Sequence, residues 1–219
     1  MTLIRFLDEA KGFAEEMSRT YHNDLVGITD GKAVGTYIEH KFMDLINSKF
    51  QVQIGSSAKG IDFPSADLNI DIKTTSNIQP QSSCPFKTAS QKIFGLGYNI
   101  IVFVYEKDDK KDANLQFVHV RYIDKKWTAD FQTTKGLKDI LDRQGNEDDV
   151  KAFLTDRMLP VDEIGLESIT SEIMKNEFVI GYLTISNALQ WRLQYRRVID
   201  LEENIDGIIR LYDAATWDR

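Results

Sequence analysis

The sequence has little cysteine, little histidine and no long apolar run. Its single cysteine, Cys84, cannot form an intrachain disulfide, and one cysteine excludes a zinc site built on several of them. The three histidines (His22, His40 and His119) are scattered without the spacing of metal ligands. No apolar run approaches the ~20 residues that span a bilayer, and the first residues lack the apolar core and cleavage site of a signal peptide. We therefore expect a cytoplasmic protein with no membrane partner.

Basic residues are also the minority, since 27 Lys and Arg against 34 Asp and Glu give a formal net charge of −7. Proteins that bind nucleic acids usually present a basic surface, so this sum argues mildly against such a partner. The argument is weak because only clustered charge matters, and carboxylates that ligate a metal count as negative until the metal binds.

The length of 219 residues predicts a single domain over residues 1–219. We expect its catalytic core at about 31–123, with a helical C-terminal portion at about 164–219 as an appendage.

The order of patterned segments predicts an α/β fold, with a mixed central β-sheet flanked by α-helices. Apolar residues at helical spacing predict helices over 3–22 and 33–48. The continuous apolar run 100–105 predicts a central strand covered on both faces, and 115–123 the next strand. The remaining expectations are short strands at 50–54 and 177–182, a short helix at 86–94, and a long helix from Asn187 with Ser186 as its N-cap.

The segment 61–75 carries the side chains that are most suggestive of chemistry. Apolar residues alternate with Asp71 and Lys73 along its second half, and Asp62 stands between two apolar residues at its beginning. A turn at 64–67 would fold these two strands into a hairpin and bring the three charged side chains together. Two carboxylates and one ammonium are the composition of a magnesium-dependent phosphodiester site. A surface hairpin with an ion pair worth under ~1 kcal/mol is an equally good interpretation of these residues alone.

The second predicted helix contributes one further acid, Glu39, on the same turn as Gly35. A glutamate beside the buried stripe of a helix is more often simply solvated. A glycine inside a helix costs ~1 kcal/mol relative to alanine, which invites a reason such as the close approach of another backbone.

Asp62 followed by Asp71-Ile72-Lys73 resembles the signature of the PD-(D/E)xK nucleases, although Ile61 replaces the proline of that signature. The stretch 62–74 is similar to the active-site hairpin of MutH and its restriction-enzyme relatives, and 71–75 is similar to the corresponding strand of EcoRV-type endonucleases. Upstream, Gly31-Lys32, Gly35 and Glu39 stand where that group has its Gly-Lys pair, its glycine and its helix glutamate. The resemblance covers about residues 31–76.

The resemblance implies a restriction-endonuclease-like core and a Mg²⁺ cofactor. Asp62 and Asp71 would ligate the metal, with the carbonyl of Ile72 as a further ligand. Lys73 would be the catalytic lysine, and Glu39 an auxiliary acid that acts on metal-bound water. Asp71 stands where MutH has Glu, a change that the superfamily pattern allows.

Asp67 competes with Asp62 for the place of the first metal ligand. We rank it below Asp62 because it lies in the turn itself, with little chain left to fold back.

Contacts with DNA are expected from polar and basic residues around this core. Residues 74–76 leave the active strand and could bond to phosphate oxygens. The helix at 86–94 and the basic–aromatic cluster at 191–197 could face DNA, but a solvated face and a packing helix with ion pairs are at least as well supported. The candidates are Lys32, Thr74, Thr75, Ser76, Lys87, Gln91, Arg192 and Arg196.

We therefore expect a Mg²⁺-dependent endonuclease that cuts double-stranded DNA, in the first place a type II restriction enzyme. A homodimer would match the two-fold symmetry of a short palindromic site, and no organic cofactor is expected. The alternatives are a MutH-like enzyme that nicks DNA as a monomer, and a non-catalytic DNA-binding protein on the same fold. Two acids facing a phosphate speak against the pure binder, because they would repel DNA unless a cation is bound.

Overall fold

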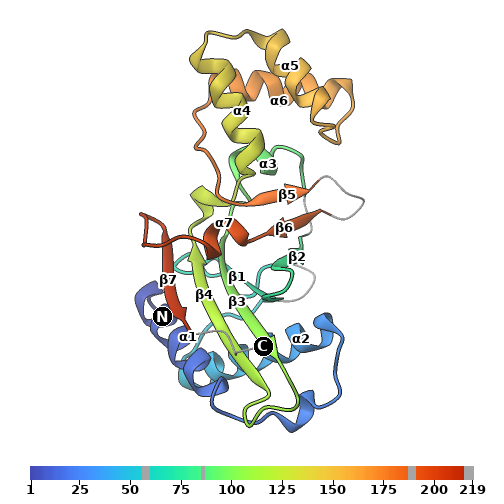
Figure 1. Ribbon diagram of the computed structural model, residues 1–219. Coiled ribbons are helices and arrows are strands. Elements are labelled where there is room, and N and C mark those ends of the chain that lie inside the picture. Colours follow the sequence, from blue (N-terminus) through green and yellow to red (C-terminus); the bar gives the residue numbers. More distant parts are fainter. Residues whose placement is uncertain (56–59, 85–86, 187–190, 215–219) are drawn as a thin grey trace.

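The computed structural model describes residues 1–55, 60–84, 87–186 and 191–214 (Figure 1). Its α-helices are α1 (Leu3–Met17), α2 (Gly31–Lys49), α3 (Gln91–Phe94), α4 (Phe131–Asp142), α5 (Glu147–Asp156), α6 (Glu163–Lys175) and α7 (Arg196–Ile199). Short 3₁₀ turns lie at Asn23–Leu25 and Lys125–Trp127. Its strands are β1 (Ile70–Ser76), β2 (Gln81–Ser83), β3 (Asn99–Lys107), β4 (Leu115–Ile123), β5 (Thr184–Ser186), β6 (Arg192–Gln194) and β7 (Ile208–Asp213).

A four-stranded mixed sheet in the order β1-β3-β4-β7 forms the centre of the molecule. Strand β1 runs parallel to β3, whereas β4 is antiparallel to both β3 and β7. The register places Asp71 opposite Ile100 and Lys73 opposite Val102. Helices flank this sheet, so the predicted fold class is confirmed. Strand β1 lies at the edge of the sheet, where its side chains can meet other elements.

The central strand β3 is buried on both faces, as its apolar run predicts. Ile101 and Phe103 belong to the core under α1 and α2, whereas Ile100 and Val102 belong to the core shared with β5, β6 and α7. The α1–α2 face is dense in rings, and Phe42 packs edge-on against Phe103 with 5.1 Å between ring centroids. These two packed faces fix β3, and β3 in turn holds β1 in place.

A second, smaller antiparallel sheet in the order β2-β6-β5 covers the other face, and it corrects our expectation for the C-terminal portion. The long helix expected from Asn187 is wrong: residues 187–190 lie outside the described residues, and the chain then forms β6, the short α7 and β7. Leu193 is fully buried between two hydrogen-bonded neighbours. Pairing on both sides outweighs a helical preference worth only tenths of a kcal/mol per residue.

Four shorter expectations also fail. Residues 50–54 and 177–182 are irregular, and the nearest strand to the latter is β5. The helix expected at 86–94 is confined to the four residues of α3, while Phe86 lies outside the described residues. The hairpin around Asp62 is reduced to one antiparallel bridge between Phe63 and Ile70.

Helices α4, α5 and α6 form a lobe of their own, which we call the helical lobe (residues 131–178). Figure 1 shows it at the end of the molecule away from α1 and α2. Its core is separate from the two cores of the central sheet. Asp130 joins the lobe to the second sheet, because its carboxylate accepts bonds from Thr133 N at 2.8 Å and from Ile185 N at 2.7 Å. No helix in the described ranges is long and apolar enough to cross a membrane.

Candidate active site at the edge of the central sheet

Asp71 and Lys73 point from β1 to the same face of the sheet, because strand side chains repeat every two residues. Ile70 and Ile72 fill the core under α1 and α2, which leaves the two charged residues on the opposite face. Asp71 is only 4% exposed, and its Oδ2 lies 2.5 Å from the Nζ of Lys73. The pair is therefore nearly removed from water at the edge of the sheet.

Asp62 is brought to this pair by the bridge that precedes β1. Phe63 and Ile70 exchange both backbone bonds, at 2.9 and 3.0 Å, which folds the chain back on itself. The carboxylate of Asp62 then accepts a hydrogen bond from the backbone N–H of Ile72 at 2.7 Å. A single bridge thus does what we expected of a full hairpin, and it places Asp62 beside Asp71.

Glu39 approaches the same group of charges from α2. The helix lies close to β1 here, since a Cβ added to Gly35 would be 3.7 Å from the Cβ of Thr74. Burial raises the pKa of Glu39 to about 7; Lys73 opposes this shift and Asp62 adds to it. The neighbour of Gly35 is thus a side chain at ordinary contact distance, and not the close backbone that we considered.

The four side chains share one electrostatic environment. Burial also raises the pKa of Asp71 to about 7, although the ammonium of Lys73 opposes the shift. Burial disfavours the charged form of Lys73, yet its pKa is raised because the carboxylate of Asp71 lies against it. Glu39, Asp62 and Asp71 therefore all interact electrostatically with the one ammonium group of Lys73.

Asp67, the competing ligand, lies in the turn between Ser65 and Asn69, and its side chain is exposed. The described residues contain no group of three or more His, Cys, Asp and Glu side chains arranged to hold a metal. Asp62 and Asp71 are the two acids that the segment 61–75 places next to each other.

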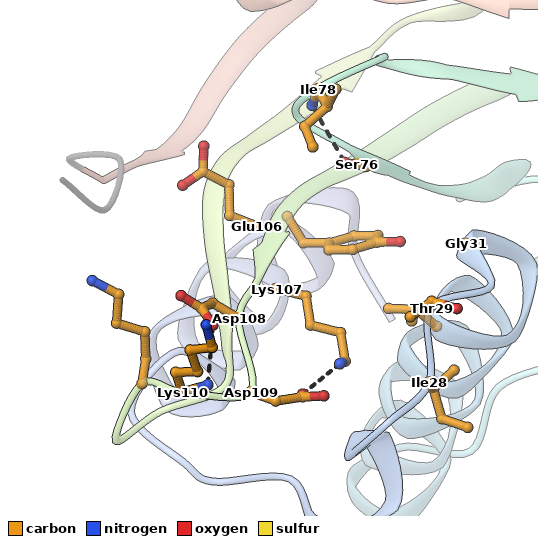
Figure 2. A pocket seen from close by; sticks show the side chains of 13 residues that line it. Ile28, Thr29, Gly31, Ser76, Ile78, Glu106, Lys107, Asp108, Asp109 and Lys110 are labelled. Carbon is orange, nitrogen blue, oxygen red and sulfur yellow. Dashed lines mark hydrogen bonds and ion pairs between the residues drawn. The ribbon is translucent and has the colours of Figure 1, made fainter. Parts of the chain in front are cut away.

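A cavity of about 700 Å³, which we call the β1-end cavity, lies beyond the last residues of β1 (Figure 2). Its walls come from the beginning of α2, the turn between β3 and β4, and residues Ser76 and Ile78. Its charges cancel, since three lysines (Lys107, Lys110 and Lys111) line it together with Glu106, Asp108 and Asp109.

Two of the DNA-contact candidates have side chains that hold the fold. The hydroxyl of Thr75 is buried and donates to the backbone oxygens of Gln79 and Gln81, at 3.2 and 3.0 Å. The amide of Gln91 accepts from the N–H of Lys87 at 2.7 Å and donates to Leu96 O at 3.0 Å. Both side chains are occupied in the fold that the structure shows.

The other candidates are distributed around the site. Thr74 faces Gly35, and its buried hydroxyl lies close enough to Glu39 to oppose the rise in the pKa of that carboxyl group. The hydroxyl of Ser76 accepts a bond from Ile78 N at 3.3 Å. The side chains of Lys32, Lys87, Arg192 and Arg196 are exposed.

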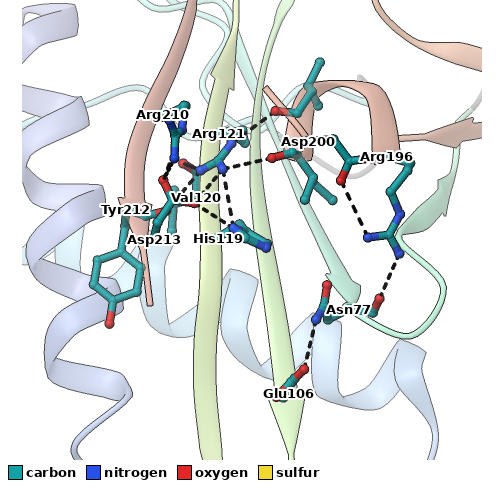
Figure 3. A network of polar contacts seen from close by, with 12 residues as sticks. Asn77, Glu106, His119, Val120, Arg121, Arg196, Asp200, Arg210, Tyr212 and Asp213 are labelled. Atoms are coloured by element: carbon teal, nitrogen blue, oxygen red, sulfur yellow. Dashed lines mark hydrogen bonds and ion pairs between the residues drawn. The ribbon is translucent and has the colours of Figure 1, made fainter. Parts of the chain in front are cut away.

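The basic–aromatic cluster at 191–197 divides between the surface and the core. Arg196 donates to Asn77 O at 3.4 Å and lies 3.9 Å from Asp200 (Figure 3). Tyr195 is fully buried, and its hydroxyl lies 2.5 Å from Ser82 Oγ. The arginine therefore braces the segment that follows β1, while the tyrosine serves as core.

Two buried residues, Cys84 and Tyr98, lie beside the site. The Sγ of Cys84 lies 3.2 Å from the hydroxyl of Tyr98, and both residues belong to the core behind the Asp71 face. Burial raises the pKa of the Cys84 thiol, while the charge of Lys73 lowers it, which places the two side chains near each other. No motif marks either residue, because their proximity arises only from the packing of β2 on β1.

The family model of the type II restriction enzyme NspV matches residues 1–210. The chain belongs to this family. It is 53% identical over 191 residues to the type II restriction enzyme NspV of Nostoc sp. (strain ATCC 29411 / PCC 7524), and the match covers 86% of either chain. No solved structure matches the chain. The protein is thus a type II restriction enzyme, a site-specific deoxyribonuclease whose substrate is DNA, as the sequence predicted. A non-catalytic DNA-binding role is set aside.

Proposed function

We propose that this restriction enzyme hydrolyses double-stranded DNA by PD-(D/E)xK chemistry, with Asp62, Asp71, Lys73 and Glu39 as its active site. The observation that carries the proposal is the buried ion pair of Asp71 and Lys73 on an edge strand, with Asp62 bonded to the same strand. Burying charged groups is costly, so a buried ion pair with further acids beside it favours a function over a contribution to stability. A purely structural ion pair gains little from a second and a third acid beside it.

The donor set fits Mg²⁺, which we propose is held by Asp62, Asp71 and the carbonyl of Ile72. Magnesium commonly binds protein through one or two carboxylates and keeps other positions for water and phosphate oxygens. Glu39, Asp62 and Asp71 give three acids to one lysine, so a divalent cation would relieve their mutual repulsion. When bound, it would supply charge neutralisation at the scissile phosphate.

Lys73 and Glu39 have different catalytic roles under this proposal, and their pKa values indicate which role each has. The raised pKa of Lys73 keeps its ammonium charged at neutral pH, so it stabilises negative charge that develops on the phosphate oxygens. The pKa of Glu39, about 7, suits a group that takes a proton from the attacking water near physiological pH. The roles differ because the ammonium of Lys73 is paired with Asp71, whereas the pKa of Glu39 stays near neutral pH although the charge of Lys73 opposes its rise.

The test is plasmid cleavage by Lys73→Ala and Asp71→Asn variants, with Lys138→Ala in the exposed helical lobe as the control. Either active-site change should lower cleavage by about 100-fold to 1,000-fold, the size expected when one electrostatic stabiliser is lost. EDTA should stop the wild-type enzyme, and Mg²⁺ should restore it. Cleavage by Lys73→Ala at the wild-type rate would remove the assignment.

We further propose that the enzyme acts as a homodimer on a two-fold symmetric site, because two identical active sites match two antiparallel strands. Conversion of supercoiled plasmid directly to discrete linear fragments supports this mode. Accumulation of open circles alone would instead support the MutH-like nicking enzyme.

A further inference from the structure

Ile78 has the most exposed side chain of all large apolar residues in the described ranges, at 82%. Single exposed apolar side chains are ordinary on protein surfaces, so exposure alone carries no argument. Its position does carry an argument, because Ile78 lies two residues after the end of β1 and five residues after Lys73. Figure 2 shows Ile78 at the rim of the β1-end cavity, across from Ile28 and Asp109.

The backbone that carries Ile78 is firmly anchored on its N-terminal side. Asn77 N donates to Tyr105 O at 2.9 Å, and its side-chain amide donates to Glu106 at 2.9 Å. Arg196 reaches across from α7 to Asn77 O at 3.4 Å (Figure 3). Three bonds to two separate elements therefore hold the residue that precedes Ile78.

The C-terminal side is anchored as well. Ile78 N donates to Ser76 Oγ at 3.3 Å, and the buried hydroxyl of Thr75 donates to Gln79 O at 3.2 Å. All these anchors use backbone atoms or neighbouring side chains, and the Ile78 side chain takes part in none of them. A rigid segment that presents an unused apolar side chain is pre-organised for binding, because little entropy is lost on contact.

The distance from the active site is suited to base contact. Five residues span at most about 18 Å, and successive bases on one strand are about 3.4 Å apart. Ile78 can therefore lie over the bases within a few positions of the cleaved bond. This step rests on the active site that we propose at Asp71 and Lys73.

The chemistry of the side chain selects the partner. Phosphates are bound by cations and hydrogen-bond donors, and the charges that line the adjacent cavity cancel. The apolar feature of a base edge is the 5-methyl group of thymine in the major groove. We propose that Ile78 is a specificity-determining residue, which contacts the 5-methyl group of a thymine within the recognition site.

The experiment compares wild-type enzyme, Ile78→Ala and Ile164→Ala. Ile164 lies on α6 in the helical lobe and is 78% exposed. Ile164→Ala therefore makes the same substitution at a similarly exposed position away from β1. Mapping the ends of digested DNA first gives the recognition site. Cleavage rates are then measured on that site, on its single-base variants, and on sites with uracil in place of each thymine.

One thymine should stand out for the wild-type enzyme, with uracil there lowering kcat/KM by about threefold to tenfold. For Ile78→Ala, kcat/KM on the normal site should be about tenfold lower than for wild type, and replacing that thymine with uracil should lower it no further. The variant should discriminate less against single-base changes at that base pair, and equally well at all others. Ile164→Ala should behave as wild type. The same thymine-to-uracil comparison in a Lys73→Ala background, by equilibrium DNA binding, separates base contact from catalysis.

The proposal is overturned if Ile78→Ala cleaves every substrate as wild type does, or loses activity equally on all of them. It is also overturned if relaxed discrimination appears at a position without thymine, or if the variant has a lowered Tm, since the side chain would then be structural. A failure of the proposed active site would appear differently, as cleavage retained by Lys73→Ala.

Discussion

Asp62 and Asp67 are the same residue type in one short segment, and their surroundings separate them. The carboxylate of Asp62 bonds to Ile72 N, whereas Asp67 is exposed in the turn. We predict that Asp62→Asn lowers cleavage in Mg²⁺ by at least about 100-fold, while Asp67→Asn stays within about twofold. Asparagine can still accept the bond from Ile72 N, so the Tm of both variants should stay near that of wild type. The reverse order of cleavage rates would make Asp67 the metal ligand.

The protonation of Glu39 and Asp71 gives the metal-free enzyme an unusual pH dependence. Both have a folded-state pKa of about 7, against ordinary values of 4.5 and 3.8. The native state therefore holds more protons than the unfolded chain between about pH 4 and pH 7, and stability falls as pH rises through this window. We predict that Tm in EDTA decreases from pH 5 to pH 8, and that Asp71→Asn flattens this slope.

Magnesium should reverse this loss, because a ligand that binds only the native state stabilises it. At pH 8, added Mg²⁺ should raise the Tm of wild type and leave that of Asp71→Asn almost unchanged. Thermal scans measure this without DNA or cleavage, and an equal rise in both proteins would contradict the metal site. Asp67→Asn serves as the matched control and should respond as wild type.

At the scale of elements, two glycines show which contacts fix the architecture. A Cβ on Gly181 would lie 2.0 Å from the backbone oxygen of Ala129, where the helical lobe rejoins the second sheet. A Cβ on Gly35 would meet only the Cβ of Thr74, at 3.7 Å. We predict that Gly181→Ala lowers the free energy of unfolding by about 3 kcal/mol.

Gly35→Ala should be neutral or stabilise by up to ~1 kcal/mol. Urea denaturation measures the free energy of unfolding of both variants. If Gly181→Ala is as stable as wild type, the backbone around Gly181 and Ala129 can shift to accommodate the added methyl group.

The elements that were predictable from sequence are those that carry their own pattern. The alternation around Asp71 and the apolar run at 100–105 each predict a strand and its buried residues, and the strands β1 and β3 form there as expected. Strand β6 has no such signal, because its three residues become a strand only when β2 and β5 pair with them. The bridge between Phe63 and Ile70 also escaped prediction in detail, since turn residues indicate a reversal but not how many pairs follow it.

The candidate site shows the same division. The resemblance to a known signature indicated Asp62, Asp71 and Lys73, and the structure brings them together at one edge. The packing of Cys84 and Tyr98 behind them depends on how β2 folds over β1, which no local pattern specifies. Likewise, Thr75 and Gln91 have the chemistry of DNA contacts, but their hydrogen bonds are used within the fold.

At the scale of the whole molecule, the acidic net charge is unevenly distributed. Residues 131–178 contain six Lys and Arg against eleven Asp and Glu, so the helical lobe accounts for −5 of the formal net charge of −7. The rest of the chain is nearly neutral. The negative sum therefore says little about the surface around β1, where DNA binds under our proposal.

The proposed dimer makes a prediction that a monomeric enzyme does not share. If each subunit cuts one strand of a symmetric site, a dimer of one wild-type and one Lys73→Ala subunit has a single working active site. Such mixed dimers, formed by co-expression with two different affinity tags and purified on both, should convert supercoiled plasmid to open circles. Wild-type dimers purified in the same way should give linear DNA without accumulation of open circles. Linear product from the doubly tagged species, or failure to recover it at all, would show that the subunits act alone. Size-exclusion chromatography with light scattering, on each preparation, confirms that the species compared have equal mass.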